Sequence, residues 1–239
     1  MLAVEDVSVR FGGQLALQDV NLQAPVGEIT GLIGPNGAGK TTLFNVITGL
    51  GSPTRGRVLL DDRDVTRIAP HRRARLGLSR TFQQLQLVGS LSVRENIELV
   101  VRRDRGGESA SACATRVMDL LGVAHLADVL AHTIPTGQAR LVELARALAS
   151  RPRLLLLDEP ASGQDPQETD QFKEILRTVA ADGVGILLVE HDVPLVMGVC
   201  SRIHVLDYGR IIASGSPSEV QSDREVVAAY LGTTEVSDA

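Results

Sequence analysis

One stretch of nine residues constrains the fold of this chain more than any other feature of the sequence. It opens with the pattern G-x-x-x-x-G-K-[ST] and consists of Gly34, Pro35, Asn36, Gly37, Ala38, Gly39, Lys40, Thr41 and Thr42. Glycines allow backbone angles that a Cβ atom forbids, so consecutive N–H groups can turn inward and surround a phosphate. The pattern predicts a nucleotide site in which Lys40 approaches the β- and γ-phosphates and the Thr41 hydroxyl binds Mg²⁺.

The flanking sequence supplies the structural context that a phosphate-binding loop needs. Residues 28–33 form a short apolar run typical of a buried strand, and apolar residues recur at helical spacing through residues 43–50. Glycine and proline at residues 49–53 then provide a stop signal. We therefore expect a strand, the loop, and a helix that begins at about Gly39 and directs its positive dipole end at the phosphates. An ordinary glycine turn is the alternative that this context disfavours.

Composition and charge exclude several classes of protein. The 239 residues suit one large α/β domain or two small ones, and 44% hydrophobic with 22% charged residues is typical of soluble globular proteins. A net charge of −5 argues against a broad nucleic-acid surface, so we expect no nucleic-acid partner. No apolar run approaches the roughly 20 residues of a membrane span, and Cys113 and Cys200 show no disulfide or metal spacing. We interpret the basic cluster of Arg72, Arg73 and Arg75 as a solvated helix face.

Hydrophobic periodicity divides the chain into an α/β part and a helical part. Residues 3–24 alternate apolar and polar side chains around Gly12-Gly13, which predicts an antiparallel hairpin or meander. About residues 87–148 show helical periodicity and few strand signals, which predicts a helical subdomain inserted in an α/β core. Its helices are expected at residues 93–101, 114–121 and 137–149. The core is expected to have strands at residues 57–60, 154–157, 184–189, 203–206 and 210–213, and helices at 167–181 and 225–231.

A second chemical signal lies at residues 154–160, where four leucines are followed by Asp158-Glu159-Pro160. A buried parallel strand would deliver Asp158 to the carboxyl edge of the sheet, where open α/β folds bind ligands. Asp158 suits the shell of Mg²⁺, which prefers oxygen ligands, and Glu159 can polarise an attacking water. A simple turn at the end of a strand is the plain alternative for such a triplet. Together with the phosphate loop, the triplet predicts ATP hydrolysis.

With three further residues, these motifs make the chain resemble the ATP-binding subunits of ABC transporters over nearly its whole length. Phe11 matches the aromatic position that stacks on adenine, although a core phenylalanine is equally compatible with the sequence. Gln83 matches the loop glutamine that reaches Mg²⁺ and the attacking water, and His191 matches the switch histidine that contacts the γ-phosphate. The resemblance implies ATP and Mg²⁺ as cofactors, with metal contacts from Thr41, Gln83 and Asp158.

The family signature is altered in this chain. Residues 134–138 lie where Leu-Ser-Gly-Gly-Gln is usual, but Pro135 fills the serine position and Thr136 that of the first glycine. The serine hydroxyl normally donates to the γ-phosphate held by the opposite subunit, and proline cannot donate. Proline does suit the first turn of a helix. We expect the N–H groups of Gly137 and Gln138, with the helix dipole and the Thr136 hydroxyl, to keep the phosphate contact.

The resemblance also implies an assembly. Two ATPase subunits, identical or paralogous, would meet head to tail, with ATP between the phosphate loop of one and the signature of the other. Asp165 matches the loop that crosses this interface. Gln83 and the adjacent helical segment would pass the resulting motion to transmembrane permease subunits, so the chain would lie on the cytoplasmic face of the cell membrane. A periplasmic or extracellular solute-binding protein would take part indirectly.

The fold implied is α/β, a P-loop NTPase core with a mostly parallel sheet, an N-terminal antiparallel β part and an inserted helical subdomain. One ABC ATPase domain would span residues 1–239, with a RecA-like core at about 1–84 and 150–239 and the subdomain at about 85–149.

The chain resembles in particular the LivG-like ATPases of branched-chain amino acid importers, a branch that also serves urea, amides and other small solutes. The motifs that carry this resemblance are residues 80–83, 93–96, 190–192, 195–198 and 229–232. ATPases of lipid or lipopolysaccharide exporters are similar over the core and remain an alternative. Soluble ABC ATPases of DNA repair or translation are a further one, but they tend to carry coiled-coil insertions or tandem ATPase domains, and neither is evident here.

Overall fold

The computed structural model describes residues 1–101 and 108–231, so Gly232 of the C-terminal motif lies outside the described residues. An antiparallel sheet of four strands in the order β2-β1-β4-β5 forms its N-terminal part. These strands are β1 (Leu2–Phe11), β2 (Gln14–Ala24), β4 (Arg55–Leu60) and β5 (Arg63–Asp64). Val4 lies opposite Leu22 on one side and Val58 on the other, which confirms the expected hairpin.

A second sheet has six strands in the order β10-β9-β3-β8-β7-β6, of which β10 is antiparallel and the others are parallel. Its strands are β3 (Ile29–Ile33), β6 (Leu78–Arg80), β7 (Leu154–Asp158), β8 (Gly185–Val189), β9 (Arg202–Asp207) and β10 (Arg210–Gly215). Every residue of β3, β7 and β8 is buried, as expected for parallel strands covered on both faces.

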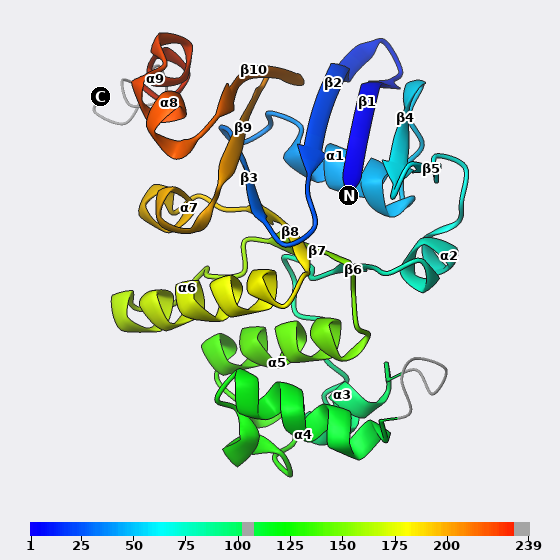
Figure 1. Cartoon of the computed structure of the whole chain (residues 1–239), viewed down its shortest axis with the longest axis vertical. Coiled ribbons are helices and arrows are strands. Elements are labelled where there is room, and N and C mark those ends of the chain that lie inside the picture. The colour runs from blue at the N-terminus through cyan, green and yellow to red at the C-terminus, as the bar shows by residue number, and fades with distance from the viewer. Residues whose placement is uncertain (102–107, 232–239) are drawn as a thin grey trace.

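Helices cover the sheets and fill the connections between strands (Figure 1). They are α1 (Lys40–Thr48), α2 (Pro70–Arg75), α3 (Val93–Glu98), α4 (Ala110–Leu120), α5 (Thr136–Ala149), α6 (Pro166–Ala181), α7 (Val193–Val199), α8 (Pro217–Ser222) and α9 (Arg224–Leu231), with 3₁₀ turns at Ala124–Leu126 and Ala131–Thr133. In Figure 1, α3, α4 and α5 gather at the end of the molecule opposite the four-stranded sheet. No helix within the described ranges is long and apolar enough to cross a bilayer.

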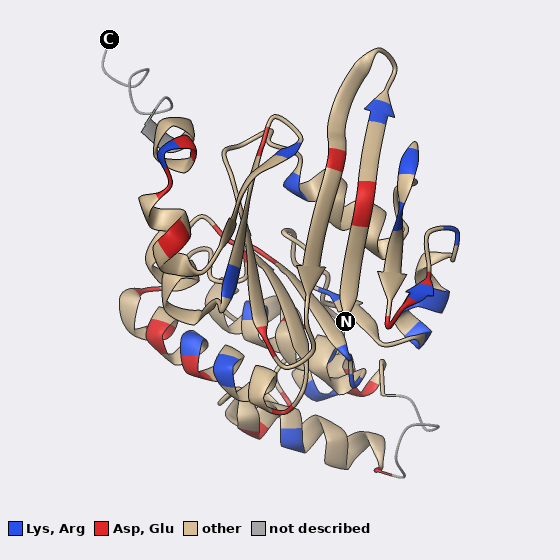
Figure 2. Cartoon of the chain, turned by 45° about the horizontal axis from the view of Figure 1, so that its top comes forward, with Lys and Arg blue, Asp and Glu red and all other residues tan. Residues whose placement is uncertain are grey.

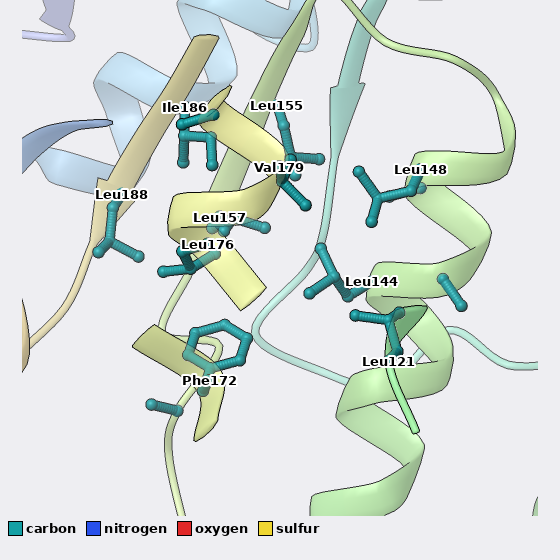
Figure 3. Close-up of a cluster of buried hydrophobic side chains, with 14 of the residues drawn as sticks. Leu121, Leu144, Leu148, Leu155, Leu157, Phe172, Leu176, Val179, Ile186 and Leu188 are labelled. Atoms are coloured by element: carbon teal, nitrogen blue, oxygen red, sulfur yellow. The ribbon is translucent and has the colours of Figure 1, made fainter. Parts of the chain in front are cut away.

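The six-stranded sheet separates two hydrophobic cores. Leu154 and Leu156 face the core shared with α1 and the four-stranded sheet, whereas Leu155 and Leu157 face the core shared with α4, α5 and α6. Figure 3 shows the second core, where Leu144 of α5 and Phe172 of α6 point toward the sheet. The four consecutive leucines are thus explained by the period-2 alternation of a strand buried on both faces.

Helices α3, α4 and α5 lie in the chain between β6 and β7 and pack on one another, as the periodicity indicated. Their buried side chains belong to the same hydrophobic core as those of β7 and α6. The division of the chain into a RecA-like core and a separate helical subdomain therefore stays a prediction. Acidic and basic residues are interspersed along the helices and strands (Figure 2).

The expectation that Arg73 is solvated is wrong. Its side chain is only 1% exposed and donates hydrogen bonds to the carbonyl oxygens of Val46 at 2.7 Å and Ile47 at 2.6 Å. These are among the last carbonyls of α1, which have no partner inside the helix. A Cβ atom at Gly49 would lie 2.8 Å from Arg73 Nε, so glycine at the C-cap makes room for the guanidinium. Arg73 thus caps the helix that follows the phosphate loop.

Candidate nucleotide-binding site

The phosphate loop connects β3 to α1, and close packing requires two of its glycines, Gly34 and Gly39. A Cβ atom at Gly34 would lie 1.9 Å from the carbonyl oxygen of Leu206, and one at Gly39 would lie 2.8 Å from Leu17 Cδ2. Gly39 is the N-cap of α1, with a φ of 112° and no side-chain cap. The helix begins at Lys40, which confirms the expected start, and the first N–H groups of α1 point toward the loop.

Lys40 lies over the loop. Its buried ammonium donates to the carbonyl oxygens of Gly34 at 2.6 Å and Pro35 at 3.0 Å. Burial lowers the pKa of Lys40, while the negative charges of Glu159 and Asp158 oppose that shift. The cation of the loop and the two acids therefore share one site.

The other loop residues keep the backbone in place or present side chains outward. Asn36 and Gly37 are exposed, and Gly37 has a φ of 81°. Ala38 is buried, and its carbonyl accepts a hydrogen bond of 2.9 Å from the N–H of Gly209 in the turn between β9 and β10. Thr41 is exposed and Thr42 half-buried, so both hydroxyls lie at the start of α1 within reach of solvent.

Asp158 and Glu159 lie at the carboxyl end of β7. The Asp158 side chain is 8% exposed, and its Oδ2 accepts a hydrogen bond of 2.9 Å from Arg80 Nη2. Glu159 has a φ of 50°, which is a left-handed backbone conformation. Such a conformation costs a residue with a side chain about 1–3 kcal/mol, and residues that adopt it are concentrated at functional sites. Its N–H donates to the carbonyl of Val189 at 2.9 Å, which connects the end of β7 to the end of β8.

The three residues expected to act in hydrolysis lie together. Gln83 Nε2 donates to Glu159 Oε2 at 3.1 Å, and His191 Nε2 lies 2.6 Å from Glu159 Oε1. Gln83 and His191 come from different loops, one after β6 and one after β8, on either side of β7. The parallel sheet therefore brings all three to one edge, where Glu159 is the central member.

The signature residues lie at the start of α5. Pro135 is the N-cap residue rather than a residue of the first turn, because the helix begins at Thr136. No side chain caps this end, so the N–H groups of Thr136, Gly137 and Gln138 in the first turn lack an intrahelical acceptor. Arg140, one turn later, donates to the carbonyl of Gln83 at 3.0 Å. The signature helix thus contacts the segment that carries Gln83.

Glu168 lies close to both Asp165 and Gly137. Asp165 is the N-cap of α6 and forms a reciprocal capping box with Glu168, in which the Glu168 N–H donates to Asp165 Oδ1 at 2.8 Å. The position of a Cβ atom on Gly137 lies 3.7 Å from Glu168 Oε1. A cavity of about 210 Å³ beside them is lined by residues that include Gln138 and Gln164.

Phe11 ends β1 and is 64% exposed, which excludes the alternative of a core phenylalanine. Its stacking on adenine stays a prediction.

A family model described as ABC transporter matches residues 17–162, which include the phosphate loop, the signature and the acids of β7. The chain belongs to the ABC transporter ATP-binding family. A second model, described as Branched-chain amino acid ATP-binding cassette transporter, matches residues 210–236.

Two curated relatives differ in what their names say they transport. The chain is 36% identical over 249 residues to the high-affinity branched-chain amino acid transport ATP-binding protein BraF of Pseudomonas aeruginosa, with 97% of this chain and 98% of BraF covered. It is also 36% identical over 233 residues to the lipopolysaccharide export system ATP-binding protein LptB of Escherichia coli, with 97% of each covered. The family is thus shared by relatives named for amino acid transport and for lipopolysaccharide export.

Solved structures of ABC cassettes have the same fold. The ADP conformation of MJ1267, an ATP-binding cassette of an ABC transporter, superposes with a TM-score of 0.87 at 32% identity, with 97% of this chain and 98% of that chain covered. The dimeric structure of MJ0796, a bacterial ABC transporter cassette, gives a TM-score of 0.82 at 26% identity, with 91% and 99% covered. This ABC protein is therefore an ATP-binding and ATP-hydrolysing subunit of the P-loop NTPase fold.

Sequence reasoning did not assign a site role to two residues of this ABC ATPase whose side chains are buried. Arg80 binds Asp158, and Glu190 accepts hydrogen bonds from the N–H groups of Ala161 at 2.7 Å and His191 at 3.1 Å. Both residues belong to motifs that were interpreted only as evidence of resemblance to the LivG-like branch. Glu190 directly precedes His191 after a fully buried strand, and this adjacency is a signal that could have identified it.

Proposed function

We propose that this chain energises an ABC importer for branched-chain amino acids or related small polar solutes such as urea and amides. The observation that supports this choice is the match of residues 210–236 to the branched-chain amino acid cassette model, since those residues lie outside the match to the general ABC model. The similarity to BraF over 97% of the chain agrees with it.

Export of a lipid or lipopolysaccharide is the second candidate, favoured by the equal 36% identity to LptB. The core that hydrolyses ATP is common to both functions, so the identity over the whole chain does not discriminate them. The C-terminal match is the feature that favours import.

In the proposed mechanism, ATP binds with its phosphates on the loop from Gly34 to Thr42 and its adenine against Phe11. The chemistry of the side chains fits Mg²⁺, because Thr41, Gln83 and Asp158 offer oxygen ligands, and Asp158 lies close enough to Lys40 for the two charges to interact. When bound, the metal would neutralise negative charge on the phosphates.

Glu159 acts as the general base toward water, since its carboxylate lies at the carboxyl edge of the sheet between two polar side chains. Gln83 orients the water. The segment that carries Gln83 also transmits conformational changes of the ATP site to the permease. His191 contacts the γ-phosphate. Because His191 and Gln83 both bond to Glu159, a change at either one alters the position of the base.

The complete site requires a second ATPase subunit. Pro135, Thr136, Gly137 and Gln138 would contact the ATP held by the opposite subunit, with donors from the uncapped first turn of α5. Asp165 would cross the interface beside them. The structure of MJ0796, a related cassette, is dimeric, which supports a second ATPase subunit here.

The partners proposed are transmembrane permease subunits, the second ATPase and, indirectly, a periplasmic or extracellular solute-binding protein. The chain would then lie at the cytoplasmic face of the cell membrane. The side chains of Phe82, Leu85 and Val88 are exposed next to Gln83 and form part of the proposed docking surface for the permease.

Uptake by a strain that lacks this chain tests the proposal. Deletion should abolish uptake of labelled leucine, or of urea or acetamide, and the wild-type chain should restore it whereas Glu159→Gln should not. Surface labelling of lipopolysaccharide in the same strains is the second measurement. Normal solute uptake together with lost lipopolysaccharide transport would contradict import and favour export.

A further inference from the structure

Arg80 is the last residue of β6, the edge strand next to β7, and its side chain is 8% exposed. Nη2 donates to Asp158 Oδ2 at 2.9 Å, and Nη1 donates to Asn45 Oδ1 at 2.8 Å. One planar guanidinium thus joins the acid at the end of β7 to the helix that follows the phosphate loop.

Two aromatic rings hold the same guanidinium. Its central carbon lies 5.3 Å from the ring centroid of Phe44 and 5.0 Å from that of Phe82, both within the range of cation–π attraction. Phe44 is buried on α1, while Phe82 directly precedes Gln83. Arg80 therefore contacts three segments, and each carries residues of the proposed ATP site.

The chemistry of these contacts requires arginine. A guanidinium can donate to two acceptors in fixed directions while its faces stack on rings, whereas a lysine ammonium is a compact point charge. Because the ion pair is buried, removing Arg80 would leave the Asp158 carboxylate without its cation. The contact through Oδ2 also restricts the carboxylate to one orientation.

We propose that Arg80 is a positioning residue that holds the Asp158 carboxylate in register with the phosphate loop and ties the Gln83 segment to both. This inference rests on the proposed role of Asp158 at the metal. Groups that orient a metal ligand from behind change metal affinity without touching the metal.

Binding of a fluorescent ATP analogue to the purified full chain, titrated with Mg²⁺ and measured again in EDTA, tests this role. Arg80→Met should bind the analogue in EDTA as the wild type does but should need about 10–100-fold more Mg²⁺ for the metal-dependent gain. Arg80→Lys should recover part of that loss. Lysine keeps the positive charge beside Asp158, but it lacks the two directed N–H donors of the guanidinium and cannot stack on the two rings in the same way. Arg153→Met, which removes the exposed ion pair of Arg153 with Asp61, is the matched control and should change nothing.

Unfolding curves show whether each variant is folded. Should Arg80→Met not fold, Asn45→Ala removes only the acceptor on α1 and should raise the Mg²⁺ requirement by a smaller factor. An unchanged Mg²⁺ requirement in every folded variant would overturn the positioning role. A wild-type chain whose binding does not respond to Mg²⁺ at all would instead contradict the proposed metal site.

Discussion

Two buried charged side chains, Arg73 and Glu190, bind main-chain groups, most of them in segments that are distant in the sequence. Arg73 donates to carbonyls at the end of α1, and Glu190 accepts from the N–H groups of Ala161 and His191. A buried charge needs such partners because its transfer out of water without them is costly. Each of these side chains therefore fixes the end of one element relative to another.

Arg73→Met should lower the free energy of unfolding by about 3 kcal/mol, because buried carbonyls, that of Ile47 among them, lose the donor that Arg73 supplies. Urea unfolding followed by circular dichroism measures the change. Arg72→Met, at an exposed position of the same helix, is the matched control and should shift stability by less than about 0.5 kcal/mol. Equal losses in the two variants would contradict the capping role of Arg73.

Burial raises the pKa of Glu190 above the ordinary 4.5, and N–H groups including that of Ala161 partly oppose the rise. Between these two pKa values the folded state binds more protons than the unfolded state. The stabilisation that Glu190 provides is therefore fully present below pH 4.5 and is lost as the pH rises through the folded pKa.

The free energy of unfolding of the wild type, measured relative to Glu190→Gln, should fall as the pH rises from 4.5. Urea unfolding of both proteins over a pH series measures this difference. A difference that grows with pH would mean that the folded state favours the ionised carboxylate.

The phosphate loop and the acids of β7 could be predicted because each is a short run of neighbouring residues. In each run, the residue types and their spacing indicate the chemistry directly. Arg73 could not be placed this way, since its acceptors on α1 lie 26 and 27 residues earlier in the chain. In the sequence it stands among other arginines, and only the tertiary fold separates the buried one from its exposed neighbours.

Among the elements, β7 was predictable and the start of α4 was less so. A strand buried on both faces is apolar at nearly every position, and four consecutive leucines match that pattern. Helix α4 begins at Ala110, four residues before the expected 114, because Ser109 caps it by accepting from the N–H of Ala112. The cap residue was a signal that the apolar periodicity alone does not contain.

The N-terminus of α5 allows a test of the altered signature. Gly137→Asp should greatly reduce ATP turnover by the assembled complex while the isolated chain still binds nucleotide. The new carboxylate would repel phosphate and would also lie near Glu168. ATPase assays of reconstituted complexes measure the effect.

Gly137→Ala separates charge from bulk at this position. A Cβ atom there meets its nearest neighbour at 3.7 Å, an ordinary contact, so this variant should keep most of its turnover. Unchanged turnover in Gly137→Asp would contradict a phosphate contact by the first turn of α5.

At the scale of the whole molecule, the parallel sheet places one half of the proposed ATP site at a single edge. The loop before α1, the acids after β7 and His191 after β8 meet there, whereas the start of α5 presents separate N–H donors. Sequence periodicity indicated the helices that carry this second element, and the family resemblance implied its partner. How the helices share a core with β7 depends on tertiary packing that periodicity does not specify.

The most direct test of the proposed hydrolytic site is ATP turnover by the dimer assembled with its permease, with Glu159→Gln beside the wild type. Glu159→Gln should bind ATP as the wild type does but lose about 10²–10⁴-fold in turnover, because the amide cannot accept a proton from water. Glu174→Gln, on the exposed side of α6, is the matched control and should turn over ATP normally. Full turnover by Glu159→Gln would contradict its role as the general base.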